Sequence, residues 1–217
     1  MLPAQGVVAF DLDGTLVPGT SVCLHLAPWL GHDELPELER RYAAGEITNH
    51  EVAERDAIFY AGRSRREVWD QLVDVPVIAG IRATVEWLKR NRLVPVIATV
   101  TWRGSAEFFK EKYAFRAASG CELQQEADGT LSGQVARHFE AADKVSFVRE
   151  LAEAEGLGFD RVVAIGDSTS DIPLFREAGL AIALNATRNA RDAAHVSLET
   201  DDLREVIPTI ESFFATT

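Results

Sequence analysis

The sequence has little cysteine and a shortage of positive charge, and each scarcity excludes a class of protein. Only two of the 217 residues are cysteines, Cys23 and Cys121, and they lie far apart with no CxxC pair. This excludes a disulfide framework and a cysteine-based zinc site. Lysine and arginine number 22 against 34 aspartates and glutamates, which gives a net charge of −12 at pH 7. A surface this acidic repels phosphate backbones, so we expect no nucleic-acid partner.

Long hydrophobic runs are also lacking. No stretch approaches the roughly 20 apolar residues that a helix needs to cross a bilayer. The first residues, MLPAQGVVAFDLDG, have no basic start and lead straight into acidic residues, which is typical of a strand and not of a signal peptide. We therefore expect a cytoplasmic protein with no membrane partner. The sequence does not indicate an oligomeric state.

Four short apolar runs have the length and composition of buried strands. They are rich in β-branched residues, and helical patterns lie between them. This alternation predicts an α/β fold with a parallel sheet and right-handed crossovers. The predicted strands are Gly6–Phe10, Val94–Ala98, Arg161–Ile165 and Leu180–Leu184, and the predicted helices are Ile81–Arg90, Ser105–Tyr113, Asp143–Glu155, Asp171–Ala178 and Asp201–Phe214.

The segment between the first two predicted strands is too long for a loop. From residue 18 to residue 79 the sequence shows only short amphipathic stretches separated by proline and glycine. A connection of this length without strands predicts an inserted helical module. Thr48, followed three residues later by Glu51, is a capping-box pattern at the start of one helix. The four predicted helices lie near residues 20–30, 35–44, 48–60 and 64–73.

We therefore divide the chain into a core, residues 1–17 and 80–217, and a helical insert, residues 18–79. Within the second part of the core, Asp128-Gly129 stands between two extended runs. An Asp-Gly pair in that setting predicts a β-hairpin, here over residues 122–135.

Two acidic turns follow predicted strands. The segment DLDGTL begins at Asp11 directly after the first strand, and GDSTSD, which contains Asp167 and Asp171, follows the third. Ligands in parallel α/β sheets bind beyond the carboxyl ends of the strands. Asp11, Asp13 and Asp167 would repel one another there without a counter-charge, and Mg²⁺, which prefers oxygen ligands, would relieve this. An acidic surface turn is the alternative interpretation of DLDGTL alone.

Thr99 and Lys144 extend this pattern. Thr99 ends the second predicted strand and offers a hydroxyl and backbone N–H groups to an anion. Lys144 lies in the first turn of a predicted helix, where the helix dipole disfavours a cation, so we expect an anionic partner. Taken alone, each residue also has a plain interpretation, as a turn residue and as a solvated lysine.

Taken in order, these four pieces resemble the haloacid dehalogenase superfamily, and within it the phosphoserine phosphatase-like group. DLDGTL resembles motif I, Thr99 motif II, Lys144 motif III and GDSTSD motif IV, at positions 11, 99, 144 and 167. The resemblance covers nearly the whole chain. It implies a Rossmann-like core with a parallel sheet, a C1-type cap of four helices in the place of the insert, and a small β-hairpin.

The resemblance also implies a mechanism. Asp11 matches the nucleophile that forms an aspartyl-phosphate, and Asp13 matches the general acid and base. The magnesium ligands would be the Asp11 carboxylate, the Asp13 backbone carbonyl and the Asp167 carboxylate. Thr99 and Lys144 match residues that bind phosphoryl oxygens. Asp171 matches a residue that orients the amine of Lys144.

At the positions that bind the substrate, the residues of this sequence differ from those of the phosphoserine phosphatase group. Thr20 stands nine places after the nucleophile, where that group has an acidic residue for the substrate amine. The arginine that binds the substrate carboxylate falls at Asp56, with Arg55 beside it. Val100 replaces a glycine and Ser170 replaces an asparagine. Our candidate substrate contacts are Thr20, Arg55, Val100 and Ser170.

The sequence thus predicts a Mg²⁺-dependent phosphomonoester hydrolase that acts on a small molecule. An uncharged Thr20 cannot pair with an ammonium, and Asp56 would repel a carboxylate unless Arg55 took its place. We therefore expect a sugar- or cyclitol-type phosphate ahead of phosphoserine. A phosphotransferase that passes the phosphoryl group to a second alcohol is the main alternative. A receiver-type signalling domain also uses an acidic cluster, but such domains lack the helical insert and an acid at the position of Asp13.

Overall fold

The computed structural model describes residues 3–216. Within this range five strands form one sheet in the order β2-β1-β5-β6-β7, and every neighbouring pair is parallel. Every residue of β1, β5 and β6 is buried, as expected of strands covered on both faces. The strands are β1 Gly6–Phe10, β2 Leu93–Ile97, β5 Val162–Gly166, β6 Leu180–Leu184 and β7 Val196–Leu198.

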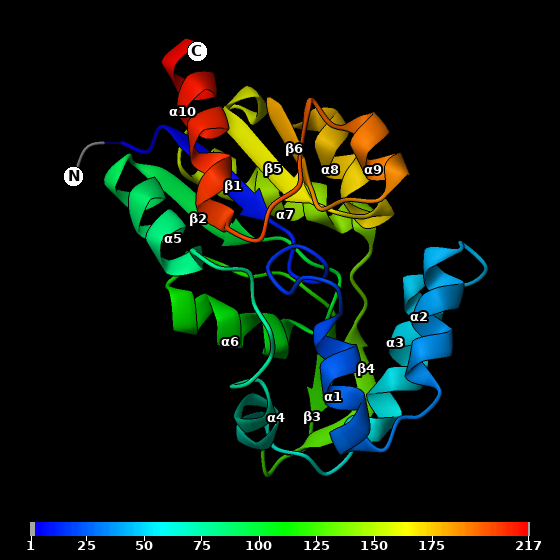
Figure 1. Ribbon diagram of the computed structural model, residues 1–217. Helices are drawn as coiled ribbons and strands as arrows, with labels where there is room; N and C mark the ends of the chain where they lie inside the picture. Colours follow the sequence, from blue (N-terminus) through cyan, green and yellow to red (C-terminus); the bar gives the residue numbers. More distant parts are fainter. Residues whose placement is uncertain (1–2, 217) are drawn as a thin grey trace.

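Helices cover both faces of this sheet (Figure 1). Val8 and Phe10 of β1 pack into the core shared with α5, α6 and α10, whereas Val7 and Ala9 pack into the core shared with α7, α8 and α9. Successive side chains of β1 thus point to opposite faces of the sheet and contribute to a hydrophobic layer on each face. These helices are α5 Ile81–Arg90, α6 Arg103–Tyr113, α7 Ala141–Ala154, α8 Ile172–Glu177, α9 Arg188–Ala193 and α10 Ile207–Thr216.

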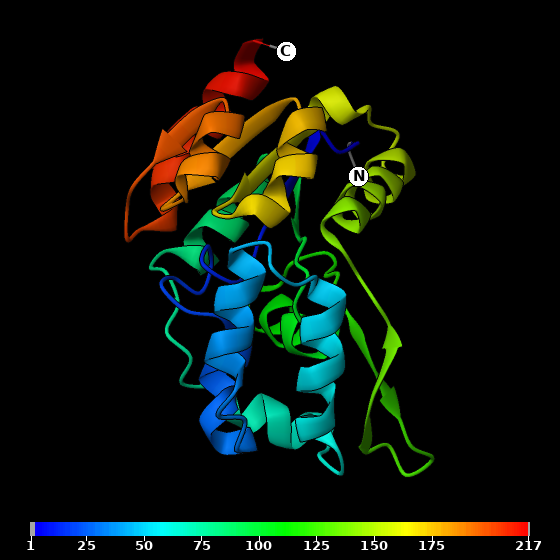
Figure 2. The ribbon, with the colours of Figure 1, turned by 90° about the vertical axis from the view of Figure 1, so that its right-hand side faces the viewer.

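The insert forms four helices, which lie beyond the carboxyl ends of the strands together with a β-hairpin (Figures 1 and 2). The capping box of Thr48 and Glu51 is formed at the start of α3. The predicted helices and hairpin are thus confirmed. Their bounds are α1 Val22–Leu30, α2 Leu35–Ala43, α3 Asn49–Ala57, α4 Arg65–Gln71, β3 Glu122–Gln125 and β4 Leu131–Arg137.

The hairpin is hydrogen-bonded to the insert. Gly62 N–H donates to Leu131 O and Leu131 N–H donates to Arg63 O, both at 2.8 Å. Asn49 Nδ2 donates to Phe139 O, just beyond β4, at 3.0 Å. We propose that the insert, residues 18–79, is a cap on the core formed by residues 1–17 and 80–217. In this proposal the hairpin, which is hydrogen-bonded to the insert, moves together with the cap. Residues 1–2 and 217 of that division lie outside the described residues.

The four predicted strands occur within one residue of their expected bounds, and the strand β7 and the helix α9 were not predicted. β7 has only three residues, and none of them is buried, so its pattern is too short to recognise. The predicted helix over 201–214 is in fact a short 3₁₀ turn, Leu203–Val206, followed by α10. In the described part of the chain, no helix has both the length and the apolar character that a membrane span requires.

Candidate active site

The strand order reverses next to β1, and a cavity of about 800 Å³ opens there between the carboxyl ends of the strands and the insert. This is where open α/β sheets bind their ligands. The core contributes the acidic turns to the lining, and the insert contributes side chains from α1, α2 and α3. Among the lining residues are the predicted Asp11, Asp13, Thr20, Thr99, Val100, Asp167 and Ser170.

Asp11 and Lys144 form a buried ion pair at the floor of this site. Asp11 N–H donates to Ile165 O at 2.8 Å, which fixes the turn after β1 beside β5. Lys144 Nζ lies 3.0 Å from Asp11 Oδ1 and 2.7 Å from Asp171 Oδ1, and it also donates to Ser170 Oγ at 3.1 Å. Lys144 has no solvent exposure. Although burial opposes its charge, the carboxylates of Asp11 and Asp171 hold the pKa of Lys144 above its usual value.

Asp167 approaches the turn of motif I from β5. Thr15 Oγ1 donates to Asp167 Oδ1 at 3.1 Å. Gly14 has a φ of +77°, and a Cβ at this position would lie 2.2 Å from Asp167 Oδ2. Only glycine permits this approach, because it has no Cβ and adopts the left-handed conformation without strain.

Asp11, Asp167 and Asp171 each offer an oxygen, and these oxygens lie within 4.8 Å of one another. Burial, followed by the charge of Asp171, raises the pKa of Asp11 to about 7. Burial, followed by the charges of Asp11 and Asp171, raises the pKa of Asp167 to about 8. Lys144 alone does not offset three acids. A hard divalent cation fits this donor set, and Mg²⁺ is the ion that suits few protein oxygens together with water and phosphate.

Asp171 is a positioning residue in this arrangement. Its Oδ1 accepts from Lys144, and its Oδ2 accepts the backbone N–H groups of Asp167 and Ser168, each at 3.1 Å. Both oxygens are therefore engaged by the chain. Asp11 and Asp167 are left as the carboxylates of this cluster available to a cation.

The Asp13 side chain faces the insert. Its Oδ1 accepts the N–H of Val22, at the start of α1, at 2.7 Å. Burial is the main reason why the pKa of Asp13 is raised to about 7, and the charges of Glu39 and Asp167 add to it, while the Val22 N–H opposes it. A carboxyl group with a pKa near neutrality can both donate and accept a proton at pH 7, as a general acid and base must.

Thr99 lies two residues after the end of β2, and its backbone N–H is not free, contrary to our expectation. This N–H donates to Ser119 Oγ at 2.9 Å. The Thr99 hydroxyl oxygen accepts from Thr101 N–H at 3.3 Å. The hydroxyl proton therefore remains to donate to an anion, and the contribution of Thr99 is its side chain alone.

The predicted substrate contacts divide into two groups. Thr20, Val100 and Ser170 line the cavity, with Ser170 bonded to Lys144. Arg55 does not: it is exposed and its neighbour Asp56 is buried in the lining. The prediction that Arg55 contacts the substrate is wrong, because α3 buries Asn49, Ala53 and Asp56 on its inner face and turns position 55 outward.

Two acidic residues of the cavity were missed or misjudged from the sequence. Glu39 on α2 is half-buried and accepts from Ser21 Oγ at 2.5 Å. Asp56 on α3 is 2 % exposed. A signal for Glu39 was present, because Leu35, Leu38, Glu39 and Tyr42 form one helical stripe and a carboxylate interrupts it.

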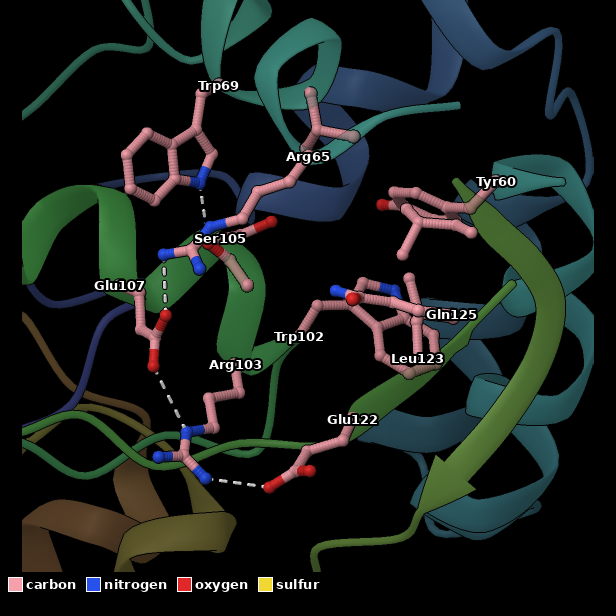
Figure 3. Close-up of a pocket in the computed structure, with 13 residues that line it drawn as sticks. Tyr60, Arg65, Trp69, Trp102, Arg103, Ser105, Glu107, Glu122, Leu123 and Gln125 are labelled. Carbon is pink, nitrogen blue, oxygen red and sulfur yellow. Dashed lines mark hydrogen bonds and ion pairs between the residues drawn. The ribbon is translucent and has the colours of Figure 1, made fainter. Parts of the chain in front are cut away.

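A second hollow, of about 220 Å³, lies beside Trp102 between α4, α6 and β3 (Figure 3). Its charged side chains are paired with one another: Arg65 with Glu107 at 2.6 Å and Arg103 with Glu122 at 2.7 Å. Trp102 lines both hollows and stands between them. The chemistry of the acidic turns is thus confined to the larger cavity.

One family model matches most of the chain. The model for haloacid dehalogenase-like hydrolases matches residues 8–176, a range that includes all four motifs. The chain belongs to this family. The resemblance noted in the sequence is therefore confirmed.

Curated relatives in this family include phosphoserine phosphatases. One from Archaeoglobus fulgidus is 30% identical over 91% of this chain, and one from Streptomyces coelicolor is 27% identical over 94%. The chain spans only 57% and 50% of the length of these two relatives. A phosphoserine phosphatase from Campylobacter jejuni subsp. doylei is 24% identical, with 93% of this chain and 97% of the relative covered.

Solved structures confirm the architecture. A structure titled as a phospho-aspartyl intermediate analogue of phosphoserine phosphatase has a TM-score of 0.83 at 24% identity, covering 95% of this chain and 99% of its own. A substrate-bound phosphoserine phosphatase complex has a TM-score of 0.84 at 23% identity, covering 96% and 100%. At this identity the likeness establishes the α/β fold of the family.

Proposed function

We propose that this protein is a Mg²⁺-dependent phosphomonoesterase that works through a phosphorylated Asp11. The observation that carries the proposal is the convergence of three groups at the acidic turns: Asp11 and Asp167 line one cavity and offer oxygens within 4.8 Å of each other, and buried Lys144 lies 3.0 Å behind Asp11. An electropositive group beside a buried carboxylate lets that carboxylate meet a phosphate dianion. Phosphoryl transfer depends mainly on such positioning and charge stabilisation.

The residues would divide the reaction as follows. A carboxylate oxygen of Asp11 attacks phosphorus in line while the bond from phosphorus to the alcohol oxygen breaks, and Asp13 gives its proton to that oxygen. Asp13 then takes a proton from water, which attacks the phosphorylated Asp11 and releases phosphate. The Thr99 hydroxyl and the Lys144 ammonium hold phosphoryl oxygens. Mg²⁺, held by Asp11, Asp167 and the backbone carbonyl of Asp13, would neutralise charge on the phosphoryl group and on the nucleophile.

The substrate in this proposal is a small phosphomonoester. The cavity of about 800 Å³ has the size of a small-molecule site and is bounded by the insert. The curated relatives named above are phosphoserine phosphatases, and they lend no support to a sugar or cyclitol phosphate. Closure of the insert over the core would exclude water during the first half-reaction.

Hydrolysis of p-nitrophenyl phosphate tests the proposal. We expect turnover with Mg²⁺, loss of turnover in EDTA, and recovery when Mg²⁺ is restored. Asp11→Asn should be inactive, whereas Asp70→Asn, a matched change of an exposed residue on α4, should retain activity. The proposal fails if wild-type protein with Mg²⁺ releases no phosphate. Release of a new ester with added acceptor alcohols would instead indicate phosphotransfer.

A further inference from the structure

The cavity continues from Asp13 toward the insert, and this side of it is acidic. Glu39 and Asp56 line it together with Asp13. The alcohol that Asp13 protonates leaves in this direction, because Asp13 is held against the start of α1 by the Val22 N–H. Glu39 is bonded to Ser21, the residue directly before Val22. The two carboxylates therefore border the space for the leaving group.

Asp56 is buried with one oxygen unsatisfied. Its Oδ2 accepts from Trp102 Nε1 at 2.6 Å, and the Cys23 thiol is a weaker donor to this carboxylate that lowers its pKa, whereas Oδ1 has no hydrogen bond within 3.5 Å among residues 3–216. A buried carboxylate oxygen without a donor lowers the stability of the folded protein. Trp102 cannot readily shift toward Asp56 Oδ1, because the indole packs edge-on against Tyr60 and lines the second hollow (Figure 3). The missing donor is thus expected from a ligand.

Neither carboxylate has a counter-charge in the described chain. The nearest candidate, His32 Nε2, lies 3.8 Å from Asp56 Oδ1, and burial lowers the pKa of His32 below its usual value. Burial therefore disfavours the charged form of His32. Of the described lining residues, only Arg188 on α9 is basic, and its side chain is 88 % exposed and lies beside Asp192.

We propose that the substrate alcohol carries a protonated primary amine and no carboxylate, and that Glu39 and Asp56 bind this ammonium. The substrate class is then a phosphate ester of a simple amino alcohol, and the inference rests on the phosphatase activity proposed above. A primary ammonium brings both the positive charge and the N–H donor that Asp56 Oδ1 lacks. A neutral sugar supplies no charge, and a quaternary ammonium supplies no donor.

The same geometry disfavours phosphoserine. Its carboxylate would stand next to its ammonium, in a space where Asp13, Glu39 and Asp56 already place negative charge. No arginine or lysine of the described insert lines the cavity to receive it. Like charges in a buried site repel strongly. Asp56 at this position thus disfavours a substrate that carries a carboxylate.

Burial and neighbouring charges agree with an incoming cation. Burial raises the pKa of Asp56 to about 6, and burial with the nearby charge of Asp56 raises the pKa of Glu39 to about 7. Burial therefore makes it costly to ionise both groups. A bound ammonium would offset that cost, as opposite charges at short range do.

The test compares kcat/KM for O-phosphoethanolamine, O-phosphoserine and 2-hydroxyethyl phosphate, with p-nitrophenyl phosphate as a general substrate. The neutral ester differs from O-phosphoethanolamine only in a hydroxyl for the ammonium. We expect O-phosphoethanolamine to exceed both other esters at least about tenfold, the equivalent of about 1.4 kcal/mol. Equal values for the neutral ester, or a higher value for phosphoserine, would overturn the inference while leaving the phosphatase proposal intact. Absence of p-nitrophenyl phosphate hydrolysis would overturn both.

Two variants locate the ammonium site. Asp56→Asn and Glu39→Gln should each lower the ratio of kcat/KM for O-phosphoethanolamine to that for 2-hydroxyethyl phosphate at least about fivefold, whereas Asp70→Asn should leave the ratio unchanged. The ratio is insensitive to the fraction of folded enzyme, which cancels between substrates. If Asp56→Asn fails to fold, Glu39→Gln decides the matter. An unchanged ratio in the folded variants would contradict the assignment.

Discussion

The ammonium of Lys144 lies 3.0 Å from the Asp11 carboxylate in a site where Lys144 has no exposed surface. Lys144 comes from α7, on one face of the sheet, and Asp11 from the turn after β1. Their contact therefore joins a covering helix to the carboxyl end of β1. Because both groups are buried, each depends on the other for its charge.

Lys144→Met should damage both stability and activity. Removing one partner of a buried ion pair leaves the other uncompensated, which typically costs about 3–5 kcal/mol. Here Asp11 and Asp171 would both lose their cation. We expect a lower urea midpoint and a loss of turnover, whereas Lys89→Met, a change at an exposed position of α5, should alter neither strongly. An unchanged urea midpoint in Lys144→Met would contradict the buried pair.

Gly14→Ala should disturb Asp167 through a direct collision. The new Cβ would lie 2.2 Å from Asp167 Oδ2, and the φ of +77° adds strain. Gly19→Ala is the matched control, because Gly19 has a similar φ of +70° but no atom within 4 Å of its Cβ. We expect Gly14→Ala to weaken Mg²⁺ binding at least about tenfold in calorimetric titrations and Gly19→Ala to leave it nearly unchanged. Similar losses in both would mean that strain alone is responsible.

Mg²⁺ should stabilise the folded protein. A ligand at about 100 times its Kd adds about 2.7 kcal/mol to the free energy of unfolding. Asp11 and Asp167 supply the carboxylates, so Asp167→Asn should remove most of this gain. The measurement is Tm with and without Mg²⁺ at constant ionic strength, with NaCl as the control. A gain that persists in Asp167→Asn would place the cation elsewhere.

Glu39 should make stability depend on pH. Its pKa is raised from 4.5 to about 7, mainly by burial, so folding favours its protonated form. Its contribution to stability is therefore complete below about pH 4.5 and is lost as the pH rises through 7. Glu39→Gln keeps an acceptor for Ser21 Oγ and removes the charge. We expect the variant to gain a few degrees in Tm over wild type at pH 8, and much less at pH 4.5. An equal gain at both pH values would exclude this titration.

The core was predictable because its signals are local. Gly6–Phe10 and Leu180–Leu184 are continuous apolar runs bounded by turn residues, and the structure has strands at the same positions. Asp11 and Asp167 follow such strands directly, so their approach is a consequence of parallel pairing between β1 and β5.

The insert side of the cavity was less predictable. Whether Arg55 or Asp56 faces inward depends on the rotation of α3, and rotating a helix by one residue turns a side chain by about 100°. The burial of Glu39 depends on α1 and α2 meeting through Ser21. Such contacts between distant segments leave only a weak mark on the sequence, here a single carboxylate on the apolar stripe of α2.

A rapid acid quench of enzyme turning over a phosphomonoester with Mg²⁺ tests the central claim most directly. Mass spectrometry of the digested protein should find one phosphoryl group on the peptide that contains Asp11, lost on treatment with hydroxylamine and absent from Asp11→Asn. If the enzyme releases phosphate while this peptide never carries a phosphoryl group, or if another residue carries it, Asp11 is not the nucleophile and the account is wrong.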